Sequence, residues 1–309
     1  MDLRQLAALV AVADRGTFSA AAESLHTVQS NVSTHIARLE RELGATLVDR
    51  TRGCLTDEGR AVVERARRIK GELDALVFDV GAIRSDVRGR ARLGVIGTTG
   101  RWLMPLLFDR LRERHPGVQL TAVEGVSTTL EPQLGSGGLD LAVVVMPVPG
   151  QDLVAEGLFG EDLVLIAPAD HPLARRSSLA LGDLDGHALL LPAPGTVLRA
   201  ALDHATTEAG ITLRTLAEID GVRLVASLAF DGYGPAIVPA TAIPRWVGPR
   251  LPWVTVSVSG LPRRHIGLAT RRRDLLSAPA RAVAAVLVEV VAADHPDRPG
   301  LHPPEVTKG

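Results

Sequence analysis

The stretch LHTVQSNVSTHIARLERELG, from Leu25 to Gly44, places many short polar side chains inside a helical pattern. These side chains are Gln29, Ser30, Asn31, Ser33 and Thr34. Serine, asparagine and threonine weaken a helix interior, so their presence there needs another reason. Glutamine and asparagine can pair with two groups of adenine, and a hydroxyl can contact a base edge or a phosphate. The chemistry that this spacing offers is the reading of DNA in the major groove.

A helical wheel divides the same stretch into two faces. The face expected in the core holds Val32, Ile36, Leu39 and Leu43, and the opposite face holds Ser30, Thr34, Arg38 and Arg41, with Asn31 nearby and Gln29 and Ser33 near the N-terminal end. The N-terminus of a helix also favours a phosphate. An ordinary helix with a solvated polar face shows the same pattern, so the neighbouring elements must decide between the two interpretations.

Two helices are predicted before this stretch and a hairpin after it. Helical spacing predicts a first helix over residues 3–16 and a short second helix over about residues 17–25. Together with the quoted stretch they form a helix-turn-helix, whose last helix enters the major groove. Residues 47–55 predict a small hairpin, or wing, in which Arg50 and Arg52 suit phosphate contact. This order of elements favours the DNA-reading interpretation.

Composition and charge are those of an ordinary globular protein of two or three domains. The chain has 309 residues, of which 46% are hydrophobic and 22% are charged, and its formal net charge is −1. A basic surface for nucleic acid must therefore be local. Cys54 is the only cysteine, which excludes a disulfide framework and a cysteine-based metal site. We expect this cysteine to be structural and the compartment to be a reducing cytosol.

The N-terminal sequence MDLRQLAALVAVADRG has an acid at Asp2 and polar residues within its apolar run. It lacks the basic start and the small-residue cleavage site of a signal peptide. No run of about 18 apolar residues occurs in the chain, so we expect no membrane span and no membrane partner. The sequence therefore predicts a cytoplasmic protein.

After Arg92 the pattern changes to apolar β-rich runs that alternate with helical segments. Such alternation predicts an α/β domain with parallel strands, and its repetition predicts two lobes. The expected divisions are a winged helix-turn-helix at 1–58, a long linker helix at 59–88, an α/β domain at 89–293 and a disordered Pro-rich tail at 294–309, with lobe I at 89–165 and 267–293 and lobe II at 166–266.

The long helix carries apolar side chains along much of its length, including Val62, Ile69, Leu73 and Leu76. A solvent-exposed helix with so much apolar surface needs a partner. That partner is either another part of the same chain or a second copy of it.

Hydroxyl side chains follow the expected strands of both lobes. They are Thr98 and Thr99 after the first strand, Ser127 and Thr128 after the second, and Thr196 in the second lobe, with Arg199 one turn later. Ligands of open α/β sheets bind where strands end and helices begin, and helix starts suit a carboxylate or another anion. Each hydroxyl could also be a plain helix cap. The convergence of three such points on one cleft favours a ligand.

The N-terminal sequence resembles that of LysR-type transcriptional regulators. The matching features are Ala21-Ala22, Leu25-His26, Gln29, Ser33, Ile36, Leu39-Glu40, Leu43-Gly44, Leu47, Arg50, Leu55-Thr56 and Gly59, and the His-Pro pairs at 115–116 and 171–172 extend the resemblance over nearly the whole chain. The resemblance implies a type 2 periplasmic-binding-protein-like fold for the two-lobed domain. It also implies binding of double-stranded promoter DNA by a homodimer or homotetramer paired through the linker helices, RNA polymerase as a further partner, and a small-molecule effector between the lobes.

Several positions depart from the common family pattern. Ser30 stands where proline is usual, Thr34 and Ala20 stand where arginine is frequent, and Val48 replaces an aromatic residue. Because these positions contact bases and phosphates in the family, the DNA sequence that relatives read is not transferable. Thr98, Ser127 and Thr196 do fall where effector contacts are usual in the family.

No catalytic constellation is recognisable in the sequence. It contains no nucleophile elbow, no phosphate-binding loop and no metal-ligand pair, so we expect no catalytic residue, no metal and no cofactor. An enzyme built on the α/β half and a secreted solute-binding protein are the alternatives. The attached helix-turn-helix counts against the first, and the N-terminal sequence counts against the second.

Overall fold

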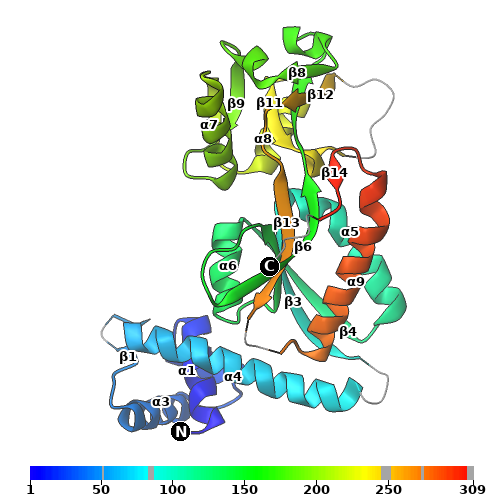
Figure 1. The fold of residues 1–309 in the computed structure, drawn as a ribbon. Coiled ribbons are helices and arrows are strands. Elements are labelled where there is room, and N and C mark those ends of the chain that lie inside the picture. The colour runs from blue at the N-terminus through cyan, green and yellow to red at the C-terminus, as the bar shows by residue number, and fades with distance from the viewer. Residues whose placement is uncertain (51, 83–86, 245–251, 273–274, 305–309) are drawn as a thin grey trace.

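The computed structural model describes residues 1–50, 52–82, 87–244, 252–272 and 275–304. It contains an N-terminal helical domain, a long helix and an α/β domain of two lobes, as the sequence predicts (Figure 1). The long helix α4, Asp57–Ala82, lies between the N-terminal helices and the nearer lobe. The sequence predicts this helix to residue 88; residues 83–86 lie outside the described residues, and residues 87–88 are not helical, so the expected end is wrong.

Three helices form the core of the N-terminal domain. They are α1 (Leu3–Arg15), α2 (Phe18–Ser24) and α3 (Gln29–Leu43). The side chains of Asp2 and Thr17 accept backbone N–H groups at the starts of α1 and α2. Gly16 and Gly44 end α1 and α3 with left-handed backbone conformations. The sequence thus sets the length of each helix locally.

The core face of α3 is shorter than its sequence suggests. Val32, Ile36 and Leu39 are fully buried in the cluster that joins α3 to α1 and α2. Leu43 is 42% exposed, so its expected place in the core is wrong. It occupies the last turn of α3, where the helix has passed the edge of that cluster.

The wing follows α3 and consists of two short antiparallel strands, β1 (Val48–Asp49) and β2 (Cys54–Leu55). The carboxylate of Glu40 in α3 fixes its base by accepting the N–H groups of Leu47 and Val48, at 2.8 and 3.2 Å. Cys54 is exposed. The structural role expected of this cysteine stays a prediction: Cys54 pairs with Asp49 in the strand ladder but joins no apolar cluster of the described part of the domain.

Lobe I is built on a six-stranded sheet with the strand order β14-β6-β13-β5-β3-β4. Its strands are β3 (Gly89–Ile96), β4 (Val118–Gly125), β5 (Leu141–Val145), β6 (Leu153–Glu161), β13 (Arg264–Arg271) and β14 (Leu301–His302). Its helices are α5 (Gly97–Arg114), α6 (Ser127–Gly135) and α9 (Ala278–Asp294). β3 is parallel to both β4 and β5, so its C-terminal end lies beside theirs.

Lobe II repeats this plan with the strand order β10-β9-β11-β7-β12-β8. Its strands are β7 (Leu163–Pro168), β8 (Ser178–Ala180), β9 (Ala188–Pro192), β10 (Arg214–Ile219), β11 (Ala236–Pro239) and β12 (Trp253–Ser259). Its helices are α7 (Val197–Ala209) and α8 (Val222–Phe230), with short 3-10 turns η1 (Pro172–Arg175), η2 (Leu181–Leu184) and η3 (Ala240–Ala242). The chain passes between the lobes from β6 to β7 and from β12 to β13.

Two expected boundaries move in the structure. β7 begins at Leu163 and β13 at Arg264, so each lobe change comes slightly earlier than the expected 165–166 and 266–267. The expected disorder from residue 294 is wrong for the described part of the tail. There η4 (His295–Asp297) leads into β14, which pairs with the edge strand β6 and buries Leu301. An unpaired strand edge and an apolar side chain together order this segment.

Among the helices of the described residues, none combines the length and apolar character that crossing a membrane requires.

Gly59 is the position where α4 passes closest to the wing. A Cβ atom there would lie 2.0 Å from the carbonyl oxygen of Leu47, which is backbone and cannot simply rotate away. We predict that Gly59→Ala displaces α4 from the wing and destabilises the N-terminal domain by about 1–3 kcal/mol. Amide hydrogen exchange of α1–α3 in the full chain measures this loss.

Gly71→Ala is the matched control on the same helix, because a Cβ atom added there would have no described neighbour within 4 Å. Alanine there is expected to stabilise the helix by about 0.5–1 kcal/mol. Equal exchange in the two variants would contradict the close passage of α4 over the wing.

Candidate functional site

The outer face of α3 presents the polar side chains that the sequence singles out. Gln29, Ser30, Asn31, Thr34 and Arg38 are exposed, and Ser33 is half-buried. The opposite face of the helix is fully buried in the domain. The six polar side chains therefore lie on a surface that the rest of the domain supports from behind.

Hydrogen bonds among neighbours orient part of this face. Ser19 in α2 donates to the side-chain oxygen of Gln29 at 3.0 Å, which leaves the amide NH₂ of Gln29 facing outwards as a donor. The Asn31 amide donates to the Thr27 hydroxyl at 2.9 Å, so its oxygen remains an acceptor. The Thr34 hydroxyl donates to a backbone carbonyl one turn earlier, at 2.8 Å. Thr34 therefore offers mainly its methyl group to a partner.

The wing presents two arginines beside this face. Arg50 lies 3.7 Å from the Glu40 carboxylate with its side chain 54% exposed, and Arg52 lies 3.7 Å from Asp49 with its side chain 81% exposed. Exposed ion pairs of this length are worth little. Both guanidinium groups can therefore leave these carboxylates for a phosphate at small cost.

The second candidate site is a cavity of about 680 Å³ between the two lobes, here called the interlobe cleft. Four of the six expected ligand residues line it: Thr98, Ser127, Thr128 and Thr196. The N-termini of α5, α6, α7 and α8 all contribute to its wall, because their first residues are among those that line it. The partial positive charges of four helix starts favour an anionic group there.

Thr99 and Arg199 are not part of the cleft, so these two expectations are wrong. Thr99 is fully buried one residue behind the wall, and among the described residues its hydroxyl has no hydrogen-bond partner. Arg199 donates to Glu218, to Asp203 and to the carbonyl of Pro192. The hydrogen bond to Glu218, followed by that to Asp203, raises the pKa of Arg199 above its ordinary value. The guanidinium group of Arg199 is therefore used in hydrogen bonds within lobe II.

The four lining hydroxyls differ in what they can still bind. Thr196 caps α7 by accepting the Arg199 N–H and donates to the carbonyl of Ala193, so its proton and one of its two lone pairs are used. Ser127 accepts the N–H of Val145 at 3.0 Å, which leaves its proton and one lone pair. Within the described part of the chain, the hydroxyls of Thr98 and Thr128 form no hydrogen bond. These two are the hydroxyls best able to contact a ligand.

An ion pair that the sequence did not reveal joins the lobes across the cleft. Arg223 of α8 in lobe II donates to the carboxylate of Glu124 at the end of β4 in lobe I. Gly97 lies beneath it, since a Cβ there would be 2.8 Å from both Arg223 Cδ and Glu124 Oε1. The sequence places Glu124 at the end of an expected strand, but it does not show that Arg223 of the other lobe is its partner.

A second unforeseen group is Arg264, which lines the cleft where the chain crosses between the lobes. Its Nη1 lies 3.1 Å from Oε1 of the fully buried Glu161, without the geometry of a hydrogen bond, so both atoms keep unfilled bonding capacity. The other carboxylate oxygen of Glu161 accepts the Thr241 hydroxyl at 2.7 Å. Arg264 is therefore held at the base of the cleft by a buried carboxylate.

Charged groups that line the cleft balance one another. They are Glu124, Asp220, Arg223 and Arg264. The cleft thus offers hydroxyls, helix starts and one arginine that is fixed at its base. Among the described residues, no group of three or more His, Cys, Asp or Glu side chains is arranged to hold a metal ion.

Comparison with known proteins identifies both parts of the chain. Residues 3–60 match the family model of the bacterial regulatory helix-turn-helix protein, lysR family, and residues 84–292 match that of the LysR substrate binding domain. A probable hydrogen peroxide-inducible genes activator from Mycobacterium leprae is 32% identical over 299 residues, which cover 94% of each chain.

Solved structures of full-length regulators share the fold. A full-length OxyR variant from Pseudomonas aeruginosa matches 100% of this chain and 99% of its own, with a TM-score of 0.79 at 24% identity. CbnR in complex with its target DNA matches 95% of this chain and 99% of its own, with a TM-score of 0.65 at 25% identity. The chain belongs to the LysR family of bacterial transcriptional regulators, with a DNA-binding and an effector-binding domain.

Proposed function

We propose that this regulator binds promoter DNA as a homodimer, or as a homotetramer of two such pairs, and that a small polar metabolite in the interlobe cleft changes this binding. The observation that carries the proposal is the polar face of α3, which is exposed, partly oriented by Ser19 and Thr27, and flanked by the arginines of the wing. A solved relative, CbnR, is described in complex with its target DNA.

In the proposed complex α3 enters the major groove. Its first turn holds the groups that can read bases, namely the Gln29 amide and the Asn31 oxygen, with the Ser30 and Ser33 hydroxyls beside them. Arg38 lies two turns later and suits a phosphate, as do Arg50 and Arg52 on the wing. Thr34 would contact a thymine methyl, because its hydroxyl is bonded within the helix.

Pairing through α4 supplies the second reading helix. Ile69, Leu73 and Leu76 recur at intervals of four and three residues, which places them on one side of the helix. They are 39%, 40% and 62% exposed, unusually much for aliphatic side chains in one row. A second copy of α4 packed against this row would cover it and bring two α3 helices to one DNA site.

The proposed effector binds without forming a covalent bond to a thiol. Several relatives are named for a response to hydrogen peroxide, but Cys54 is the only cysteine of this chain and it lies in the wing. The balanced charges of the cleft suit a small metabolite with a single anionic group. Arg264 and the helix starts would hold that group, and the free hydroxyls of Thr98 and Thr128 would bind its polar atoms.

Gln29→Ala tests the reading of bases. We predict about a 5- to 150-fold loss of affinity for a DNA fragment that the protein selects from genomic DNA, because a good base contact is worth about 1–3 kcal/mol. Affinity for unrelated DNA should stay the same. Competition binding at one salt concentration measures both, with the exposed Gln151→Ala of lobe I as the control. If Gln29→Ala kept the same sequence preference, the assignment of α3 as the helix that contacts the bases would be wrong.

Arg52→Ala tests the wing. Loss of one phosphate contact should weaken binding to all DNA sequences alike and reduce the slope of log affinity against log salt by about 1. Arg175→Ala removes an exposed arginine from lobe II and should leave the slope unaltered. A wild-type slope in Arg52→Ala would mean that the wing does not touch the backbone.

Thr98→Val tests the interlobe cleft with little change of side-chain shape. Small hydroxy acids and keto acids are screened for those that raise the unfolding temperature of the full chain. We predict that Thr98→Val abolishes this rise for the compounds found, while DNA affinity in their absence is retained. The exposed Thr121→Val of β4 is the control. Wild-type stabilisation of Thr98→Val would place the ligand elsewhere.

A further inference from the structure

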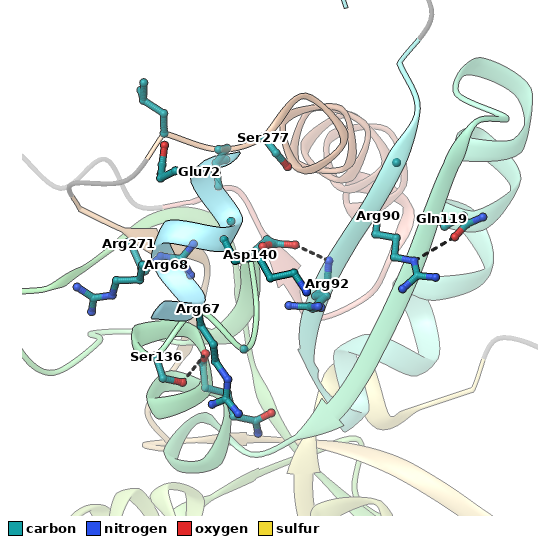
Figure 2. A pocket seen from close by; sticks show the side chains of 18 of the residues that line it. Arg67, Arg68, Glu72, Arg90, Arg92, Gln119, Ser136, Asp140, Arg271 and Ser277 are labelled. Carbon is teal, nitrogen blue, oxygen red and sulfur yellow. Dashed lines mark hydrogen bonds between the residues drawn. The ribbon is translucent and has the colours of Figure 1, made fainter. Parts of the chain in front are cut away.

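A second large cavity lies on the opposite side of lobe I, between that lobe and α4 (Figure 2). Its volume is about 980 Å³, and it shares no lining residue with the interlobe cleft. Seven arginine and lysine side chains line it, against three carboxylates. Since the whole chain has a net charge of −1, this concentration of positive charge is local. We call this space the basic cavity.

The cations of the basic cavity come from two bodies. Arg67, Arg68 and Lys70 belong to α4, whereas Arg90 and Arg92 belong to β3 of lobe I. Figure 2 shows the labelled arginines of α4 and of β3 on either side of the space. A ligand that touched both sets would connect the helix that carries the DNA-binding domain to the effector-binding domain.

Some of these cations already have partners. Arg67 pairs with Asp14 of α1, and Arg68 donates to the carbonyl of Gly135 at 2.7 Å. The Nε atom of Arg68 is buried and finds no hydrogen-bond partner in the part of the chain that the structure describes. Arg90 makes one long hydrogen bond of 3.3 Å to Gln119. These bonds hold the guanidinium groups in place without neutralising the positive charge of Arg68 or Arg90.

Arg92 and Lys70 are the cations with most freedom to bind. The backbone N–H of Arg92 donates to the Asp140 carboxylate at 2.8 Å, which fixes its position on β3. Within the described residues, neither the Arg92 guanidinium nor the Lys70 ammonium has a hydrogen bond or an ion pair. Both are exposed to the solvent of the basic cavity. Like charges that line one cavity repel one another, so an anion that binds between them is stabilised.

We propose that the basic cavity binds a small polyanion with at least two phosphate groups, as a second ligand distinct from that of the interlobe cleft. Arginine favours phosphate because its planar group can donate two parallel hydrogen bonds to it. A ligand with two phosphate groups can contact both sets of cations at once, because arginines of α4 and of β3 both line the space. The bound polyanion fixes α4 against lobe I and thereby changes DNA affinity.

The test uses the full chain and tripolyphosphate as the probe, with ionic strength held constant. Titration calorimetry should detect one site per chain that orthophosphate does not fill. Arg92→Gln should weaken tripolyphosphate binding about tenfold, the effect of one charge-assisted bond. Lys70→Gln, a change at an exposed position, gives a second variant that is expected to fold normally. Bound tripolyphosphate should also slow amide hydrogen exchange in the second half of α4.

Arg65→Gln is the matched control, because Arg65 is exposed on the same helix but does not line the basic cavity. If Arg65→Gln lost as much tripolyphosphate affinity as Arg92→Gln, the effect would be a general electrostatic attraction, and the proposal would be overturned. A loss of tripolyphosphate affinity in Thr98→Val would assign the probe to the interlobe cleft and would also overturn the proposal. Weaker DNA binding and a smaller salt slope in Arg92→Gln without the probe would identify the cavity as a DNA contact instead.

Discussion

The buried carboxylate of Glu161 is the constraint on which the two-lobed domain depends. It lies where the chain first leaves lobe I, and burying a charge costs several kcal/mol unless partners balance it. Thr241 of lobe II and Arg264 at the start of β13 are those partners. One carboxylate thus gathers both lobes and fixes Arg264 at the base of the interlobe cleft. A ligand that binds Arg264 necessarily acts on the contact that sets how the lobes meet.

Contacts of α4 continue this connection towards the DNA-binding domain. Arg68 bonds to the carbonyl of Gly135 at the end of α6, and one turn of the same helix also carries Arg67, which pairs with Asp14 of α1. The helix is therefore attached to lobe I and to the N-terminal domain at nearly the same level. These contacts form a continuous physical route from the interlobe cleft, whose wall includes the start of α6, to α1 and α3.

Local chemistry explains what the sequence could predict. The spacing of apolar residues and the caps around them determine α1 to α3, and four of the hydroxyls predicted after strands line the interlobe cleft. Three of the failures depend on distant partners. Arg199 was assigned to the ligand because its bond to Glu218 on β10 is invisible in sequence. The sequence did not predict a role for Arg264, because that role depends on the buried Glu161 of another strand. The tail was expected to be disordered, because the sequence does not show that β14 pairs with the free edge of β6.

In the proposed function, two copies of the chain read two half-sites of DNA under the control of the effector-binding domain. Selection of genomic DNA fragments by the purified full chain, followed by footprinting at one fixed salt concentration, tests it most directly. We expect enriched fragments with paired half-sites whose centres lie about one helical turn, or a small multiple of it, apart. Protection that depends on salt but not on sequence, or a single unpaired site, would contradict it.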